Sequence, residues 1–240
     1  NGFENIVHSK LKGFEGDIRV YKNNLNSKWH EIDGVDKTIP FMERKVVIKA
    51  NGVSRVVSMK AVDNKIMPKF YDLFVRGSFP NDGEILIGEN LAYRMGIEIG
   101  NKVSVSSPID QTIGLAIPYK NSYHVCGIFS TKILNFDDQI IFGTISDGKR
   151  LFSRKEMIDG YDVRVENNYA ISKVKKKIID HIGTEFSVLS WDDQNKSLVN
   201  AMKMERYATI TVLSFIFVVS TFNLVSNLSL ISIQKTKEIG

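Results

Sequence analysis

The chain has 240 residues, of which 43% are hydrophobic and 25% are charged, and its formal net charge is +5. This apolar content excludes an intrinsically disordered chain, and the single cysteine, Cys126, excludes a small fold held together by disulfides. The positive charge shows neither an aromatic-interleaved basic stripe nor zinc-finger spacing, so nucleic acid is not an expected partner.

The first half of the chain contains helix and strand patterns in alternation. The predicted elements are a helix over 1–14, strands over 16–21, 44–49, 54–61 and 84–88, and a short helix over 89–95. Asn51-Gly52 stands between two alternating runs, which is a strong signal for a tight β-hairpin. Gly96 follows the second helix directly and suits the left-handed position that ends many helices.

The second half contains more strands than helices. The predicted elements are strands over 102–106, 123–129, 139–142, 161–165 and 186–189, and helices over 147–152 and 170–182. The longer of these helices is amphipathic, because apolar residues such as Val174 and Ile178 recur on one face.

The C-terminal part is far more apolar than the mean hydropathy of −0.11 suggests. No charged residue occurs in the window Tyr207–Gln234. A membrane-spanning helix needs roughly 20 apolar residues, and this window exceeds that length. A fully buried core helix is the alternative, although such helices are usually shorter. The Ser, Thr and Asn residues inside the window suit a helix that packs against other membrane helices.

A helix is predicted to start at Ser190, which forms a capping-box pattern with Asp193. No Pro or Gly occurs from Trp191 to Lys237, so the pattern predicts one unbroken helix of roughly 47 residues, about 70 Å long. Only about 30 Å of this fits the hydrocarbon core of a membrane, so residues 191–206 are expected to form a stalk. Basic residues flank both ends of the window, and charge therefore does not decide the orientation.

No motif in the sequence indicates catalysis. Residues 143–150 match most of a P-loop, but Arg150 replaces the Ser or Thr that would bind Mg²⁺, so we do not expect this chain to bind ATP. The histidines are scattered, and the pairs Asp137-Asp138 and Asp192-Asp193 are adjacent, which points their side chains in different directions. We therefore expect a protein that is not an enzyme and that uses no cofactor and no metal.

The connection Ser107–Asn121 is long for a hairpin loop and contains both glycine and proline. It also carries several apolar side chains, including Ile113 and Leu115. One interpretation is that it packs back on its own domain. The other is that it forms an exposed apolar arm that binds a partner. Spacing alone favours neither.

Several short segments carry a family pattern when they are taken together. They are Asn1–Phe3, Ile87–Ala92, Met95–Val105, Val125–Phe129, Trp191 to Asn195, Ala201–Arg206 and Gln234–Gly240. Each segment is weak alone, but their order and spacing resemble the permease subunit of bacterial lipoprotein-releasing ABC transporters. These permeases fall within the FtsX-like, macrolide-exporter-type superfamily, and the resemblance covers essentially the whole chain.

The resemblance implies an α+β fold, with an extracytoplasmic domain between two membrane helices. This domain has a mixed βαβ part from both chain ends, 15–62 with 160–190, and an inserted, mostly β part over 63–159. Stalk helices are expected over 1–14 and 191–206, a membrane helix over 207–234, and the start of a cytoplasmic coupling segment over 235–240. Residues 1–206 would be periplasmic, on the outer side of the bacterial inner membrane. The chain starts at Asn1 and stops in a polar segment, so we expect a piece of a longer protein.

The resemblance also implies partners. They are a separate cytoplasmic ABC ATPase, a second permease subunit in a homodimer or heterodimer, a periplasmic lipoprotein chaperone and the lipoprotein cargo. In one permease type of the family a hairpin hook captures the chaperone, with a polar pad beside it. The matching hook residues are Ile113, Gly114, Leu115, Ile117 and Pro118, and the pad residues are Lys120 and Asn121. Ile113 stands where the family's hook tip has a proline. Coupling to the ATPase is expected at Lys235, Lys237 and Glu238.

The expected function is therefore extraction of lipoproteins from the inner membrane and their transfer to a chaperone, with motion transmitted through the stalks. A related permease that exports a peptide or drug, or that activates a cell-wall hydrolase, is the alternative. A membrane-anchored enzyme is a third hypothesis, against which the lack of a catalytic motif argues.

Overall fold

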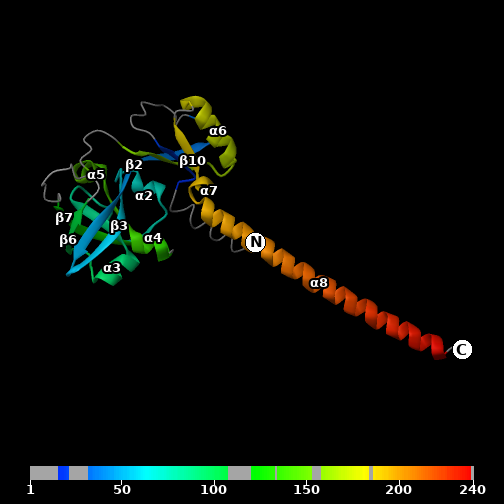
Figure 1. Cartoon of the computed structure of the whole chain (residues 1–240). Coiled ribbons are helices and arrows are strands. Elements are labelled where there is room, and N and C mark those ends of the chain that lie inside the picture. Colours follow the sequence, from blue (N-terminus) through cyan, green and yellow to red (C-terminus); the bar gives the residue numbers. More distant parts are fainter. Residues whose placement is uncertain are drawn as a thin grey trace, which may run out of the picture. The chain divides into compact units, whose positions relative to one another are not determined.

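The computed structural model describes residues 16–21, 32–107, 120–132, 134–152, 158–183 and 186–238 (Figure 1). The chain divides into two compact units, Asn1–Gln194 and Asn195–Gly240. The first contains a sheet with short helices, and the second is a single long helix. The helix expected over 1–14 lies outside the described residues.

The strands and helices have the following bounds in chain order. The strands are β1 Ile18–Tyr21, β2 Val35–Ala50, β3 Val53–Val62, β4 Phe74–Gly77, β5 Glu84–Gly88, β6 Lys102–Ser106, β7 Lys120–Ser130, β8 Ile140–Thr144, β9 Gly160–Val165 and β10 Ser187–Ser190. The helices are α2 Met67–Phe70, α3 Glu89–Met95, α4 Leu134–Gln139, α5 Ile145–Leu151, α6 Ile171–Ile182, α7 Trp191–Gln194 and α8 Lys196–Glu238.

In the described part of the first unit, the strands form one ten-stranded mixed sheet. Its order is β10-β1-β9-β2-β3-β8-β5-β7-β4, and β6 pairs with both β2 and β7. The pairs β3–β8 and β5–β7 are parallel, whereas the other pairs are antiparallel. A mixed sheet domain followed by a long apolar helix confirms the expected α+β class.

Strand β2 belongs to two parts of this sheet. Its first residues, from Val35 to Phe41, pair with β9, and its residues from Phe41 to Ala50 pair with β3. The pairing partner therefore changes at Phe41. We call β10, β1, β9 and the first half of β2 the terminal sub-sheet. The second half of β2 and the remaining strands form the central sub-sheet.

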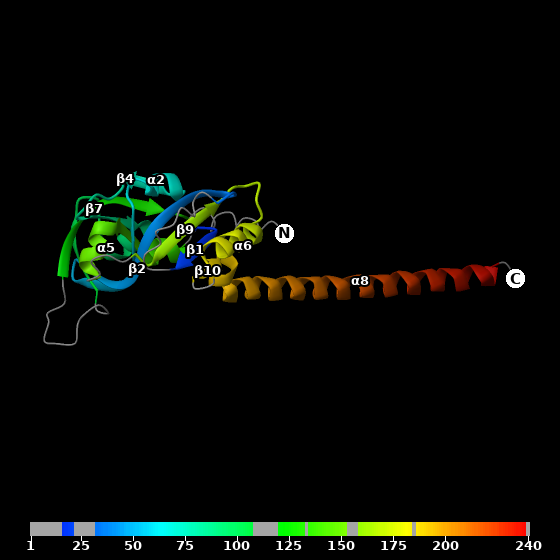
Figure 2. The same cartoon turned by 90° about the horizontal axis from the view of Figure 1, so that it is seen from above.

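Apolar residues cover the sheet in three clusters. On the terminal sub-sheet, α6 lies beside the sheet (Figure 2), and its Val174 and Ile178 belong to one buried cluster with Ile18 and Val20 of β1. On the central sub-sheet, a larger cluster lies beneath α3 and α5 and includes Met42 of β2. The third cluster includes the neighbouring Phe41 and, from α2, Met67 and Phe70. Successive side chains in a strand point to opposite faces, so these last two clusters cover opposite faces of β2.

The hairpin and the end of α3 confirm two local predictions, and they contact each other. Asn51 and Gly52, between β2 and β3, have φ angles of 50° and 77°, as a tight hairpin turn requires. Gly96 ends α3 with a φ of 61° in the left-handed region. The Asn51 side-chain amide donates hydrogen bonds to the carbonyl oxygens of Met95 at 3.1 Å and Gly96 at 2.7 Å. The turn thus caps the C-terminus of α3.

Some elements differ from the prediction because distant contacts form them. The strand predicted to start at residue 44 starts at Val35, since its first half gains hydrogen bonds from β9. Helices α2 and α4 and strand β4 were not predicted. The division of the sheet domain at 62/63 and 159/160 stays a prediction.

The helix expected to run unbroken from Trp191 is interrupted at Asn195, which separates α7 from α8. Trp191 is buried, and its backbone N–H donates to the Asp17 carbonyl oxygen at 3.0 Å, so tertiary contacts hold the first turn. Helix α8 then begins with a bond from the Val199 N–H to the Asn195 carbonyl oxygen at 3.0 Å.

Candidate functional site

The predicted hook is attached to a paired base. Strands β6 and β7 are antiparallel, with Ser106 opposite Lys120 and Val105 opposite Asn121. The connection between them therefore leaves and re-enters the sheet at neighbouring positions. The predicted hook residues Ile113, Gly114, Leu115, Ile117 and Pro118 lie outside the described residues, whereas the predicted pad residues Lys120 and Asn121 begin β7.

The base of this connection is firmly anchored. Val103 and Val105 of β6 and Tyr123 of β7 are buried in the central sub-sheet. The Asn121 side-chain amide donates to the Tyr123 hydroxyl at 3.4 Å, and burial raises the pKa of Tyr123 above its usual value. On its other edge, β6 pairs with residues Val47–Lys49 of β2. The described base of the connection is therefore held by buried side chains and by strand pairing on both edges of β6.

The second candidate site is α8. Residues Val199–Ser232 are long and apolar enough to cross a membrane, with a mean hydropathy of 2.0 in their most apolar part, none of which is buried within the protein. Large side chains such as Phe215, Phe217 and Phe222 are about 70% exposed. A helix that is apolar on all sides needs an apolar environment around it.

Four hydroxyl groups of α8 are satisfied inside the helix. Thr209, Thr211, Ser214 and Thr221 each donate to the carbonyl oxygen four residues earlier, at 2.8–2.9 Å. Such back-bonding removes the cost of placing a hydroxyl in hydrocarbon, where no water is available. These four hydroxyl residues are therefore compatible with a membrane.

The predicted coupling residues Lys235, Lys237 and Glu238 lie in the last turns of α8. They belong to the second unit, whereas the hook and pad belong to the first. The pad residues thus lie at the start of β7 and the coupling residues at the end of α8, and their roles stay predictions.

The P-loop-like segment 143–150 forms the end of β8 and helix α5. A Cβ on Gly148 would lie 2.6 Å from the Cβ of Ala61, so this glycine permits close packing of α5 on β3. The buried Asp147 carboxylate accepts hydrogen bonds from the Gly83 N–H and the Arg150 guanidinium. Among the described residues, no group of three metal-ligating side chains gathers.

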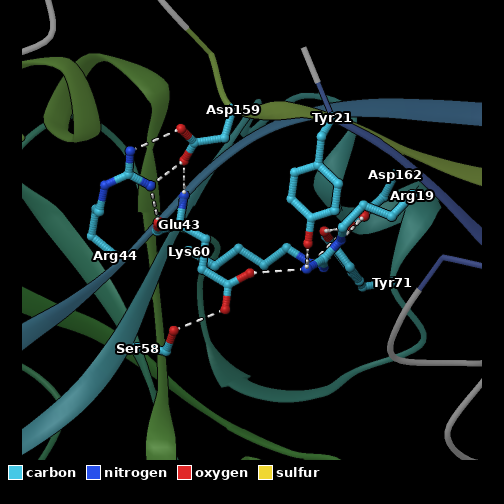
Figure 3. Close-up of polar contacts among 9 residues, drawn as sticks. All are labelled: Arg19, Tyr21, Glu43, Arg44, Ser58, Lys60, Tyr71, Asp159 and Asp162. Carbon is cyan, nitrogen blue, oxygen red and sulfur yellow. Dashed lines mark hydrogen bonds and ion pairs between the residues drawn. The ribbon is translucent and has the colours of Figure 1, made fainter. Parts of the chain in front are cut away.

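A buried ion cluster is the feature that sequence reasoning missed (Figure 3). Asp162 of β9 is fully buried, and its carboxylate accepts from Nε of Arg19 at 2.7 Å and from Nζ of Lys60 at 2.6 Å. Arg19 also donates to Glu43 at 3.2 Å, and the Tyr71 hydroxyl lies 3.4 Å from Asp162. Strands β1, β3 and β9 and the residue after α2 thus meet at one carboxylate, and β2 joins the cluster through the bond between Glu43 and Arg19.

The electrostatics of this cluster favour its ionised form. Burial alone would raise the pKa of Asp162, but the charges of Lys60 and Arg19 outweigh it and lower that pKa to about 2. Burial likewise opposes the charge on Arg19, yet Asp162 and Glu43 raise its pKa above the usual value. Burial, and then the Asp162 charge, raises the pKa of Tyr71. The carboxylate is therefore charged at physiological pH.

A lone charge between apolar neighbours was the available signal for this cluster. Arg19 lies between Ile18 and Val20, and Asp162 lies between Tyr161 and Val163. Alternation normally assigns such a charge to the solvated face of a strand. Only the covering of that face by α2 and its cluster reverses the assignment.

Comparison with known proteins gives relatives over the whole chain. The chain is 22% identical over 257 residues to the lipoprotein-releasing system transmembrane protein LolC of Neisseria meningitidis, covering 100% of this chain and 62% of the relative. It is 24% identical over 220 residues to LolC of Haemophilus influenzae, covering 86% and 53% respectively. The chain thus spans about three fifths of the length of the first of these relatives. No protein-family model matches it.

Among solved structures, the periplasmic region of MacB from Actinobacillus actinomycetemcomitans is similar, with a TM-score of 0.54 and 10% sequence identity. The match covers 79% of this chain and 96% of that region. It shows a shared fold. Together with the LolC relatives, it confirms the resemblance to lipoprotein-releasing permeases that the sequence motifs indicated.

Proposed function

We propose that the chain is part of the permease subunit of an ABC transporter. In this proposal α8 crosses the inner membrane, the sheet domain is periplasmic, and a separate cytoplasmic ATPase supplies the energy. The observation that supports this proposal most strongly is that LolC of Neisseria meningitidis aligns with 100% of this chain. The apolar helix Val199–Ser232 and the MacB-like fold of the domain agree with it.

The more specific proposal is that this permease extracts lipoproteins from the inner membrane and passes them to a periplasmic chaperone. Its partners would be the ATPase, a second permease subunit, the chaperone and the lipoprotein cargo. The name of the relatives supports the cargo. The connection 107–121 supports the chaperone, because a long apolar segment attached to a rigid base at β6 and β7 suits capture of a partner.

In this mechanism the chain does no chemistry and transmits movement. The ATPase would act near Lys235, Lys237 and Glu238 and displace α8. In the chain, α8 is directly preceded by α7 and β10, and β10 pairs with β1 along four residue pairs. Movement would then pass through the sheet domain to the connection 107–121.

The experiment is capture of the lipoprotein chaperone by the full-length permease with its ATPase. Ile113→Asp and Leu115→Asp should each abolish capture, because a carboxylate on an apolar contact surface must lose its hydration without a partner. Val56→Asp is the matched control, since Val56 is a 67% exposed apolar residue on β3, outside the connection. Undiminished capture by both variants would refute the role of the hook in binding the chaperone. Failure of the wild-type protein to co-purify with an ATPase would refute the permease proposal itself.

A further inference from the structure

The two sub-sheets are joined through one continuous strand. Strand β2 runs from Val35 to Ala50 and changes its partner from β9 to β3 at Phe41. A single strand can bend and twist where its neighbours change, and such points are natural hinges. The side chains around Phe41 therefore decide whether this junction is flexible or rigid.

One face of the junction carries the buried cluster, which we call the inner clasp: Arg19, Glu43, Lys60 and Asp162. Arg19 and Asp162 are opposite each other on β1 and β9, in the terminal sub-sheet. Glu43 and Lys60 are opposite each other on β2 and β3, in the central sub-sheet. The bonds from Lys60 to Asp162 at 2.6 Å and from Arg19 to Glu43 at 3.2 Å both cross the junction.

Phe41 lies within the inner clasp. The Arg19 guanidinium carbon is 4.5 Å from the centre of the Phe41 ring, and the Lys60 ammonium is 5.6 Å from it. Tyr21 of β1 contacts the same ring edge to face, with centroids 5.9 Å apart. The residue at which β2 changes partner is thus held by two cations and an aromatic ring.

The opposite face carries a second ion pair, the outer clasp, formed by Arg44 and Asp159. The Arg44 side chain must point away from that of Glu43, because the two residues are neighbours in a strand. Its guanidinium binds the Asp159 carboxylate with both terminal nitrogens, at 2.8 and 3.1 Å. The same carboxylate accepts from the Glu43 N–H at 2.8 Å, and the Asp159 N–H donates to the Phe41 carbonyl oxygen at 2.9 Å.

We propose that the inner and outer clasps together fix the angle between the terminal and central sub-sheets, and so make the sheet domain a rigid transmitter between α7 and the connection 107–121. The fixed angle concerns this fold alone, whereas the role in transmission rests on the proposed function. Ion pairs suit this task because their hydrogen bonds are directional, whereas apolar contacts allow sliding. Two clasps on opposite faces resist bending in both directions.

The direct test measures the angle by spin-label distances in the full-length permease with its ATPase in nanodiscs. Labels are placed at Asp180→Cys on α6 and Tyr93→Cys on α3, because both residues are exposed and the two helices pack on different sub-sheets. Cys126→Ser removes the native thiol and keeps a donor for the Ser78 carbonyl oxygen. The double variant Lys60→Met with Asp162→Asn removes one charge of each sign and leaves Arg19 paired with Glu43.

We expect the distance distribution of this double variant to broaden about twofold, because a junction that loses the Lys60–Asp162 ion pair, the shorter of its two inner cross-junction bonds, samples more angles. The matched control is Lys177→Met with Asp33→Asn. It removes the same residue types from an exposed 2.8 Å ion pair between α6 and the residues before β2. Its distribution should equal that of the wild type. An unbroadened distribution in the folded double variant would overturn the proposal.

A second variant covers the case in which the inner double variant does not fold. Arg44→Gln opens only the outer clasp, whose Arg44 and Asp159 side chains are 22% and 12% exposed. It should broaden the distance distribution less than the inner double variant does, and an unchanged width would contradict the role of this clasp.

A transport assay tests the transmission of movement separately from the angle. Loss of ATP-driven lipoprotein release with unchanged chaperone capture supports transmission, and normal release despite a broadened distribution refutes it. Absence of release in the wild type refutes the proposed function and leaves the distance result valid.

Discussion

The Asp162 carboxylate combines complete burial with a lowered pKa, and this makes it a pH-sensitive contributor to stability. Burial opposes its charge, but Lys60 and Arg19 lower its pKa to about 2. An aspartate in an unfolded chain has a pKa near 3.9. Because the folded pKa is the lower one, its contribution is present above about pH 4 and is lost as the pH falls towards 2.

We expect the wild type to lose about 2 kcal/mol of unfolding free energy more than Asp162→Asn does when the pH falls from 4.5 to 2. The Asn variant is less stable at neutral pH but lacks this proton-linked loss. Urea unfolding of the detergent-solubilised protein, followed by tryptophan fluorescence, measures the difference. If the unfolding free energies of the two proteins changed in parallel with pH, this result would contradict the lowered pKa of Asp162. Asp180→Asn, at an exposed carboxylate of α6, serves as the control.

At the scale of elements, the β2–β3 turn and helix α3 stabilise each other. Helix α3 ends with bonds from the Gly96 N–H to the Tyr93 carbonyl oxygen at 3.3 Å and from the Ile97 N–H to that of Ala92 at 2.9 Å. This is the Schellman pattern, with a buried apolar residue after the glycine. The Asn51 amide supplies donors to the Met95 and Gly96 carbonyl oxygens of the same helix end.

Asn51→Asp should destabilise the protein by about 1–2 kcal/mol, because a carboxylate cannot donate and its charge is unfavourable at a helix C-terminus. Asn51→Gly is the matched control, since it keeps the positive φ of the turn and loses only the two hydrogen bonds. Hydrogen exchange of the Ile97 amide measures the local effect. It should accelerate more in the Asp variant than in the Gly variant, and equal rates would exclude the charge contribution.

At the scale of the whole molecule, the chain combines a packed sheet domain with a helix whose most apolar part is not covered by other parts of the protein. The side chains of the first unit form three buried clusters, whereas the most apolar part of α8 is not buried at all. The hydrophobic effect therefore stabilises the first unit by internal packing and requires an external apolar phase for the second.

Phe217→Asp, in the middle of the uncharged window, should raise the apparent insertion free energy of Val199–Ser232 by about 2.5–3.5 kcal/mol. Met204→Asp, which lies near the start of this segment, should cost much less, because a charge near the end of a span reaches the interface. An insertion assay of the segment in a host membrane protein measures both. Equal costs at the two positions would contradict the placement of the span.

The sequence predicted the elements whose signals are local. The Asn51-Gly52 turn, the end of α3 at Gly96, the amphipathic helix α6 and the apolar helix α8 each depend on residues within a few positions of one another. Motif order also indicated the permease family, which the LolC relatives support. The predicted hook residues lie outside the described residues, so their role stays a prediction.

The tertiary structure decided what depends on distant residues. The first half of β2 is a strand because β9 pairs with it, and Arg19 meets Asp162 although 143 positions separate them. A charge in an apolar strand has the same local pattern whether it faces water or a buried partner. The physical reason is that periodicity records only which face of an element a side chain occupies. What covers that face is set by the packing of the whole sheet.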